Sequence, residues 1–132
     1  MTTTSRTTER HIEHLRPNEI FVFGSNLAGM HAGGAAHLAM ERWGAVWGQG
    51  VGLQGQTYAI PTMQGDVETI KPYVDDFIQF AKDNPDKLFL VTEIGCGIAR
   101  FQPQDIAPLF KEAIPVNNIH LPERFWAVLG SS

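Results

Sequence analysis

Residues 19–43 constrain the fold more than any other part of the chain. They open with a short apolar run of strand-forming residues, 20–23, which predicts a buried β-strand. A glycine-rich loop follows, and residues 35–42 are mostly strong helix formers. Anions bind where such a loop enters a helix, because glycine lets the backbone approach a ligand and the first helical amides lack intrahelical partners. We therefore predict that this loop holds a phosphate or pyrophosphate; alternatively, its glycines only shape the turn.

Length and composition predict one ordinary domain over residues 1–132, with a loosely ordered N-terminal segment at 1–16. A net charge of −4 argues against general nucleic-acid binding. The single cysteine, Cys96, excludes an intrachain disulfide. No signal peptide and no membrane-spanning apolar run is evident, so we expect a cytoplasmic protein with no membrane partner.

The rest of the chain alternates between strand and helix patterns. Residues 57–60, 88–92 and 118–121 read as strands. Between the first two, apolar residues at helical spacing predict a helix that is N-capped by Thr69, and a further helix contains Ile106. This alternation predicts an α/β fold, a three-layer α/β/α sandwich with a mostly parallel central sheet.

A second glycine-containing loop, at residues 94–101, repeats the pattern of the first: a buried strand ends and small residues expose backbone amides. Right-handed crossovers would bring both loops to the carboxyl edge of the sheet, where α/β folds bind ligands. Two facing loops can hold the two ends of a diphosphate, and their pairing is a more specific signal than either loop alone.

Three segments carry a family resemblance. They read FGSNLAGMHAGGAAHLAMERWG (23–44), YAIPT (58–62) and IGCGIARF (94–101). In motif order and spacing they resemble the macrodomain superfamily of ADP-ribose-binding α/β/α modules, and in particular a compact, macro-like group of bacterial and phage-type proteins. The resemblance covers residues 20 to 110, most of the chain.

The resemblance implies how a ligand would lie. Asn26 would sit near the distal ribose, residues 33–35 would line the diphosphate, residues 95–99 would form the facing loop, and Phe101 would flank the distal ribose. The complete set of expected ligand-binding residues is Gly24, Ser25, Asn26, Gly33, Gly34, Ala35, Gly95, Cys96, Gly97, Ile98, Ala99, Arg100 and Phe101.

The chain departs from the family pattern in two places. De-ADP-ribosylating members of one major branch carry an acidic residue just after the glycine run, where this chain has Ala36. Alanine cannot activate a water molecule, so the sequence does not support hydrolysis by that route. The aspartate on an early strand that usually recognises adenine is not evident either.

Three residues are the candidates for catalysis. Asn26 can position a substrate or cap a turn, His31 can transfer protons or be an ordinary loop histidine, and Glu93 can act as a general base or be a surface carboxylate. Arg100 can pair with a phosphate. Cys96 could act as a nucleophile only if the fold brought His31 or His120 close to it, and it is better explained as a small loop residue.

These observations favour a protein that binds ADP-ribose or a related nucleotide diphosphate and, if it is an enzyme, hydrolyses an ADP-ribose derivative. We expect no cofactor and no metal site, and the sequence leaves a homo-oligomer open. One alternative is a Rossmann-like nucleotide-processing enzyme of the phosphoribohydrolase type, although the PGGxGTxxE-type segment of those enzymes does not occur. Another is a non-catalytic oligomeric interaction protein, with Trp43, Trp47 and Trp126 at its contacts.

Overall fold

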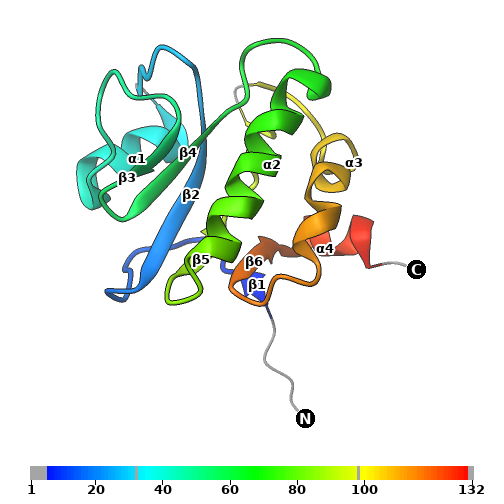
Figure 1. Ribbon diagram of the computed structural model, residues 1–132. Coiled ribbons are helices and arrows are strands. Elements are labelled where there is room, and N and C mark those ends of the chain that lie inside the picture. The colour runs from blue at the N-terminus through cyan, green and yellow to red at the C-terminus, as the bar shows by residue number, and fades with distance from the viewer. Residues whose placement is uncertain (1–5, 32, 98, 131–132) are drawn as a thin grey trace.

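A six-stranded sheet organises the protein, as the computed structural model shows for residues 6–31, 33–97 and 99–130 (Figure 1). Its strands lie in the order β1-β6-β5-β2-β4-β3. β3 runs antiparallel to β4, and the other neighbours are parallel. The strands are β1 (Thr7–Thr8), β2 (Glu19–Ser25), β3 (Gly52–Gln54), β4 (Thr57–Pro61), β5 (Leu88–Val91) and β6 (Ile119–Pro122).

Helices cover both faces of this sheet. The helical elements are α1 (Gly34–Trp43), α2 (Val67–Asp83), α3 (Pro103–Ile106), the 3-10 helix η1 (Ala107–Ala113) and α4 (Glu123–Leu129). α1 packs on one face, and the others share the opposite face (Figure 1). The predicted α/β class with a mostly parallel central sheet is confirmed. Within the described part of the chain, no helix is long and apolar enough to cross a membrane.

The two faces follow from the alternation of side chains along β2. Ile20 and Val22 point into a large apolar core, whereas Phe21 and Phe23 point into a small one beneath α1. α2 presents Ile70, Val74, Phe77, Ile78 and Ala81 to the large core, all on one helical face. The apolar pattern of the sequence thus places the central elements.

The two edge strands were not expected. Thr7–Thr8 pairs with β6, so part of the N-terminal segment that we expected to be loosely ordered belongs to the sheet, and residues 1–5 lie outside the described residues. Gly52–Gln54, for which the sequence predicted no strand, pairs with β4. α2 also starts earlier than expected: its N-cap is Asp66, and Thr69 Oγ donates to the Asp66 carbonyl.

Candidate functional site

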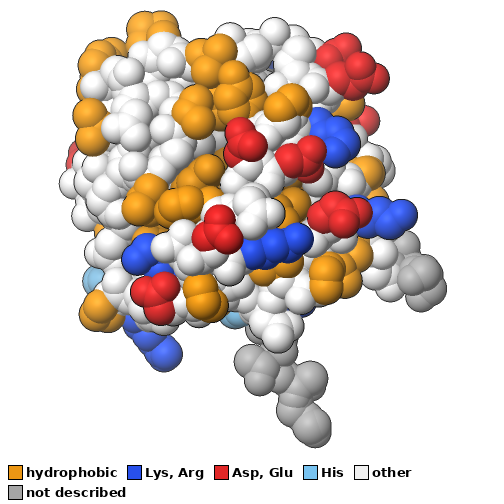
Figure 2. Space-filling view, viewed as in Figure 1, with side chains coloured by type: hydrophobic (Ala, Val, Ile, Leu, Met, Phe, Trp, Pro, Cys, Tyr) orange, Lys and Arg blue, Asp and Glu red, His pale blue; other side chains and the backbone are white. Residues whose placement is uncertain are grey.

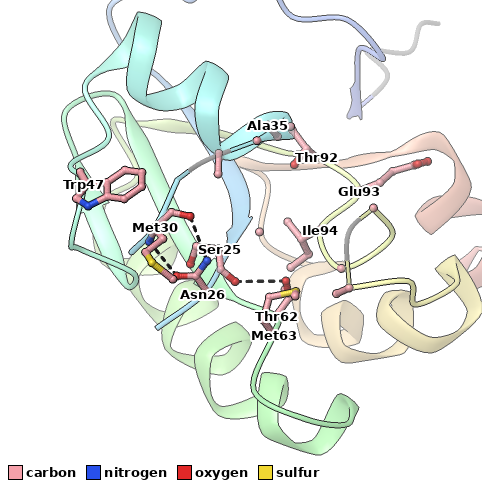
Figure 3. Close-up of a pocket in the computed structure, with 17 residues that line it drawn as sticks. Ser25, Asn26, Met30, Ala35, Trp47, Thr62, Met63, Thr92, Glu93 and Ile94 are labelled. Atoms are coloured by element: carbon pink, nitrogen blue, oxygen red, sulfur yellow. Dashed lines mark hydrogen bonds between the residues drawn. The ribbon is translucent and has the colours of Figure 1, made fainter. Parts of the chain in front are cut away.

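A cavity of about 430 Å³ opens at the carboxyl ends of β2, β4 and β5 (Figure 3). Both predicted glycine loops contribute to its wall, one leading from β2 into α1 and one following β5. The described lining residues are Gly24, Ser25, Asn26, Met30, Gly33, Gly34, Ala35, Ala36, Trp47, Thr62, Met63, Thr92, Glu93, Ile94, Gly95, Gly97 and Ala99. Residues 70 positions apart in sequence are therefore brought to one place by the parallel arrangement of β2 and β5.

The N-terminus of α1 faces this cavity without a protein cap. Gly33 is the N-cap residue, no side chain of the described residues makes a capping hydrogen bond, and the first turn carries no acidic residue. Gly34 has φ +60°, and a Cβ at this position would meet nothing within 4 Å. The first helical amides and the positive end of the helix dipole are thus directed to a space that can hold an anion.

The second loop lies against the first through close backbone contact. A Cβ on Gly24 would lie 3.3 Å from the backbone nitrogen of Gly95 and 3.2 Å from Thr62 Oγ. Gly95 itself has φ +75°, a conformation that side-chain-bearing residues rarely adopt. Gly97, further along the same loop, is exposed, and a Cβ there would meet no atom within 4 Å. The backbone conformation of Gly95 therefore favours glycine, the space around Gly24 is tight, and Gly97 leaves the cavity open.

A third segment, residues 46–50, is fastened to the first loop. The Gly48 amide donates to the Gly29 carbonyl at 2.8 Å, and Ser25 Oγ donates to the Gly50 carbonyl. A Cβ on Gly29 would lie 2.3 Å from the Gln49 nitrogen, and a Cβ on Gly50 would lie 2.1 Å from the Asn26 carbonyl oxygen. This backbone-to-backbone packing brings Trp47 to the cavity.

Asn26 uses its side chain to shape the first loop. Its Oδ1 accepts from the Met30 amide at 2.9 Å, and its Nδ2 donates to the Met30 carbonyl at 3.1 Å (Figure 3). Both the oxygen and the nitrogen of the side-chain amide thus bond to the backbone of the same turn, which is common for asparagine in loops. Asn26 lines the cavity, but its side-chain hydrogen bonds stabilise the loop.

Glu93 is the one ionisable side chain among the described residues that line the cavity. Arg124 of α4 forms a bidentate ion pair with the Glu93 carboxylate, with Nε–Oε2 and Nη2–Oε1 distances of 2.8 and 2.6 Å. Hydrogen bonds from Arg124 lower the pKa of Glu93, which weakens it as a base. Its side chain extends away from the cavity centre (Figure 3), toward a smaller cavity of about 150 Å³ that it also lines.

Several predicted site residues lie elsewhere. His31 is fully buried, packs edge-on against Phe23, and makes a hydrogen bond between its Nε2 and the Gln49 carbonyl. It therefore stabilises the packing of the first loop on residues 46–50 and does not line the cavity. Phe101 packs on the large core, and Arg100 is exposed with φ +66°; neither lines the cavity. Cys96 also packs on the large core rather than lining the cavity.

Burial raises the pKa of the Cys96 thiol to about 11, which disfavours the nucleophilic thiolate. Ile98, the remaining predicted ligand contact, lies outside the described residues.

The cavity also contains residues that the sequence did not single out. Thr62 and Thr92 directly follow β4 and β5, and both bond to β2 carbonyls, Ser25 and Val22. Their position at strand ends is a signal that sequence reasoning can use. Met30, Met63 and Trp47 were missed because their proximity to the cavity depends on loop packing.

No group of three His, Cys, Asp or Glu side chains that could hold a metal ion occurs in residues 6–31, 33–97 and 99–130. Comparisons with protein-family models, curated proteins and solved structures found no match to this chain.

Proposed function

We propose that this protein binds ADP-ribose or a related nucleotide diphosphate in the 430 Å³ cavity. The observation that carries the proposal is the meeting of two glycine loops over the uncapped N-terminus of α1. Backbone amides are good partners for a diphosphate, because they donate hydrogen bonds without placing a bulky side chain beside it. The volume lies within the range of pockets that bind small molecules and cofactors. The motif resemblance to macrodomains points to the same class of ligand.

The geometry supports binding better than catalysis. The Glu93 carboxylate is held in an ion pair with Arg124, and Ala36 has no group that transfers protons. His31 does not line the cavity. A general base has to reach the proton that it removes, either directly or through one water molecule. We therefore propose a ligand-binding module as the primary function, with hydrolysis of an ADP-ribose derivative as an activity to be tested only after binding.

Calorimetric titration with ADP-ribose, using ADP and ribose-5-phosphate as controls, tests the proposal. We expect micromolar binding of ADP-ribose by the unmodified protein. Gly97→Glu adds a carboxylate at the cavity wall, at a position where a Cβ meets no atom within 4 Å. Affinity for a diphosphate should therefore fall about tenfold or more, equivalent to ~1.4 kcal/mol. Gly34→Glu should have the same effect from the opposite loop.

Gly52→Glu is the matched control. Gly52 has φ +90° and open space around a Cβ, as Gly34 has, but it does not line the cavity. The control therefore adds the same charge and a backbone strain comparable to that of Gly34→Glu outside the site. Equal loss of affinity in Gly52→Glu and the two cavity variants would contradict the proposed site, as would full retention of affinity in the cavity variants.

A further inference from the structure

Exposed large apolar side chains gather in one region of the protein. Among the described residues, all of them except Ile114 belong to three segments at the β3 end of the sheet and around the cavity mouth. These side chains are Leu27, Met30, Val46, Trp47, Val51, Leu53 and Met63. Figure 2 shows apolar surface along the upper left of the view, over this end of the sheet, whereas acidic and basic side chains are spread over the rest of the visible face. Apolar surface concentrated beside a cavity is typical of a binding site.

Three of these side chains line the cavity itself. Met30, Trp47 and Met63 are 54%, 56% and 46% exposed, and they come from three separate segments of the chain. We call them the apolar rim. Figure 3 shows Trp47 and Met30 on the same side as Asn26, with Glu93 on the opposite side.

The backbone that carries Trp47 is fixed although its indole is exposed. The Gln49 carbonyl receives hydrogen bonds from Gln54 Nε2 at 2.8 Å and contacts His31 Nε2 at 3.1 Å. The Val46 amide donates to Gln54 Oε1 at 2.7 Å. A ligand that stacks on the indole would therefore meet a backbone that is already ordered, so less conformational entropy is lost on binding.

The chemistry of the rim selects a particular kind of group. An indole and two thioethers are polarisable and uncharged, which suits a flat π-system rather than a carboxylate. Glu93, the ionisable group of the cavity wall, is on the other side and is paired with Arg124. Aromatic side chains that stack on bases do so with little dependence on base identity, since every base has a π-face.

We propose that the apolar rim is a subsite for a planar heteroaromatic ring, so that the ligand carries such a ring at the end of its diphosphate nearest Asn26. The proposal rests on the proposed function and narrows it. The preferred ligand is a dinucleotide or a base-linked ADP-ribose, rather than ADP-ribose with a free terminal ribose.

Titrations with four ligands test this subsite. NAD⁺ and diadenosine diphosphate carry a ring at both ends, whereas ADP-ribose and ADP carry one ring. We expect both two-ring ligands to bind about tenfold more tightly than ADP-ribose, in line with the typical contribution of one stacked base. Diadenosine diphosphate separates stacking from charge, because its second ring is neutral whereas the nicotinamide ring of NAD⁺ is cationic.

Variants at Trp47 assign the preference to the rim. Trp47→Ala should reduce the affinity for the two-ring ligands to that for ADP-ribose and leave ADP-ribose binding within about twofold. Trp47→Phe should keep most of the preference, because it keeps a ring. Leu53→Ala is the matched control, since Leu53 is 39% exposed in the same region but does not line the cavity, and it should change neither affinity.

The outcomes separate the two proposals. If ADP-ribose binds, the two-ring ligands bind no more tightly, and Trp47→Ala leaves the affinity for ADP-ribose unchanged, the subsite is overturned and the proposed function stands. If Trp47→Ala instead weakens ADP-ribose binding, the rim stacks the single adenine, and the preference for a second ring is overturned. If none of the four ligands binds, both are overturned. If Trp47→Ala leaves every affinity unchanged but alters the oligomeric state in light scattering, the rim is a protein contact and the subsite is overturned.

Discussion

On one face of the sheet, α2, α3, η1 and α4 cover a continuous core of large side chains, whereas α1 covers only a small core on the other face. The large core contains rings that contact one another, including Phe77 with Phe89 and Phe110 with Phe125. The small core consists mainly of Phe21, Phe23 and buried alanines. Apolar burial is therefore distributed very unequally between the two faces.

The loops beside the small core are held in a different way. Their contacts are hydrogen bonds between backbone groups, hydrogen bonds made by the side chains of Ser25, Asn26 and Gln54, and close approaches at Gly29 and Gly50. Such contacts fix the course of the chain but bury little apolar surface. Apolar burial is therefore concentrated on the α2 face, while the loops that shape the candidate site are concentrated at the α1 edge. Substitutions on the two sides should consequently affect different properties.

The largest effect is expected from Phe77→Ala. Phe77 is fully buried, with ring centroids of Tyr58 and Phe89 at 5.1 and 5.5 Å. Removing the ring leaves a cavity enclosed on all sides, so the free energy of unfolding should fall by about 3–5 kcal/mol in urea denaturation. Phe21→Ala is the counterpart on the other face and should cost less, because half-buried Trp43, 4.7 Å away between ring centroids, can move into the space. Equal losses of unfolding free energy in the two variants would contradict the proposed difference between the two cores.

A second variant tests how the edge strand β1 is attached to the α2 side. The Arg6 guanidinium donates to the carbonyls of Ala113, Ile114, Val116 and Ile119 and lies 5.1 Å from the Trp126 ring centroid. Arg6→Met keeps the aliphatic stem but removes the guanidinium donor from these carbonyls, although those of Ala113 and Val116 still accept a backbone amide. The free energy of unfolding should therefore fall by about 3 kcal/mol. Arg16→Met removes the same charge from an exposed side chain and should change stability little. A loss in Arg16→Met as large as in Arg6→Met would refute the anchoring role.

The third variant acts on the α1 edge. Gly50→Ala would place a Cβ 2.1 Å from the Asn26 carbonyl oxygen and 2.7 Å from that of Leu27, so the two loops must move apart. We expect at least a tenfold loss of ADP-ribose affinity in calorimetry, with a loss of stability of about 1–2 kcal/mol that is smaller than for Phe77→Ala. Gly52→Ala has open space around its Cβ and should leave affinity intact despite its φ of +90°. Unchanged binding in Gly50→Ala would show that loop packing does not shape the site.

The same difference between the two sides of the molecule decides which helices and strands could be predicted from the sequence. The central strands and α2 were predictable because their buried faces impose apolar periodicity on long segments. β1 and β3 were not, since strands of two and three residues carry too few side chains to show a pattern. β3 is instead placed by a tight turn in which Gly55 has φ +59°.

The residues of the candidate site also divide into some that the sequence predicts and others that only the structure reveals. The glycine loops were predictable because they follow buried strands, and parallel strands bring their ends together. Trp47 was not predictable as a lining residue, because it reaches the cavity through contact between Gly29 and residues 48–49, far away in sequence. His31 and Phe101 have chemistry that suits a site, but their burial against the two cores is a three-dimensional property.

The smallest effect is expected at Glu93, which follows β5 and joins the cavity wall to α4 through Arg124. Hydrogen bonds from Arg124 lower the pKa of Glu93 in the folded state, so the ion pair stabilises the fold above the ordinary carboxyl pKa of about 4. This contribution is lost as pH falls through the lowered pKa. Glu93→Gln should therefore be slightly less stable than the unmodified protein at pH 7, by less than any variant above, because partly exposed ion pairs contribute little.

Thermal denaturation between about pH 7 and pH 2.5 measures this difference, which should shrink toward zero in acid as Glu93 takes up a proton. Glu112→Gln, at an exposed carboxylate on η1, controls for the change in net charge and should show no comparable trend. A Glu93→Gln deficit that stays constant down to the lowest pH would mean that the side chain acts through packing rather than charge. It would also remove the evidence that the ion pair with Arg124 weakens Glu93 as a base. This small effect therefore bears on whether Glu93 could act in proton transfer at the site.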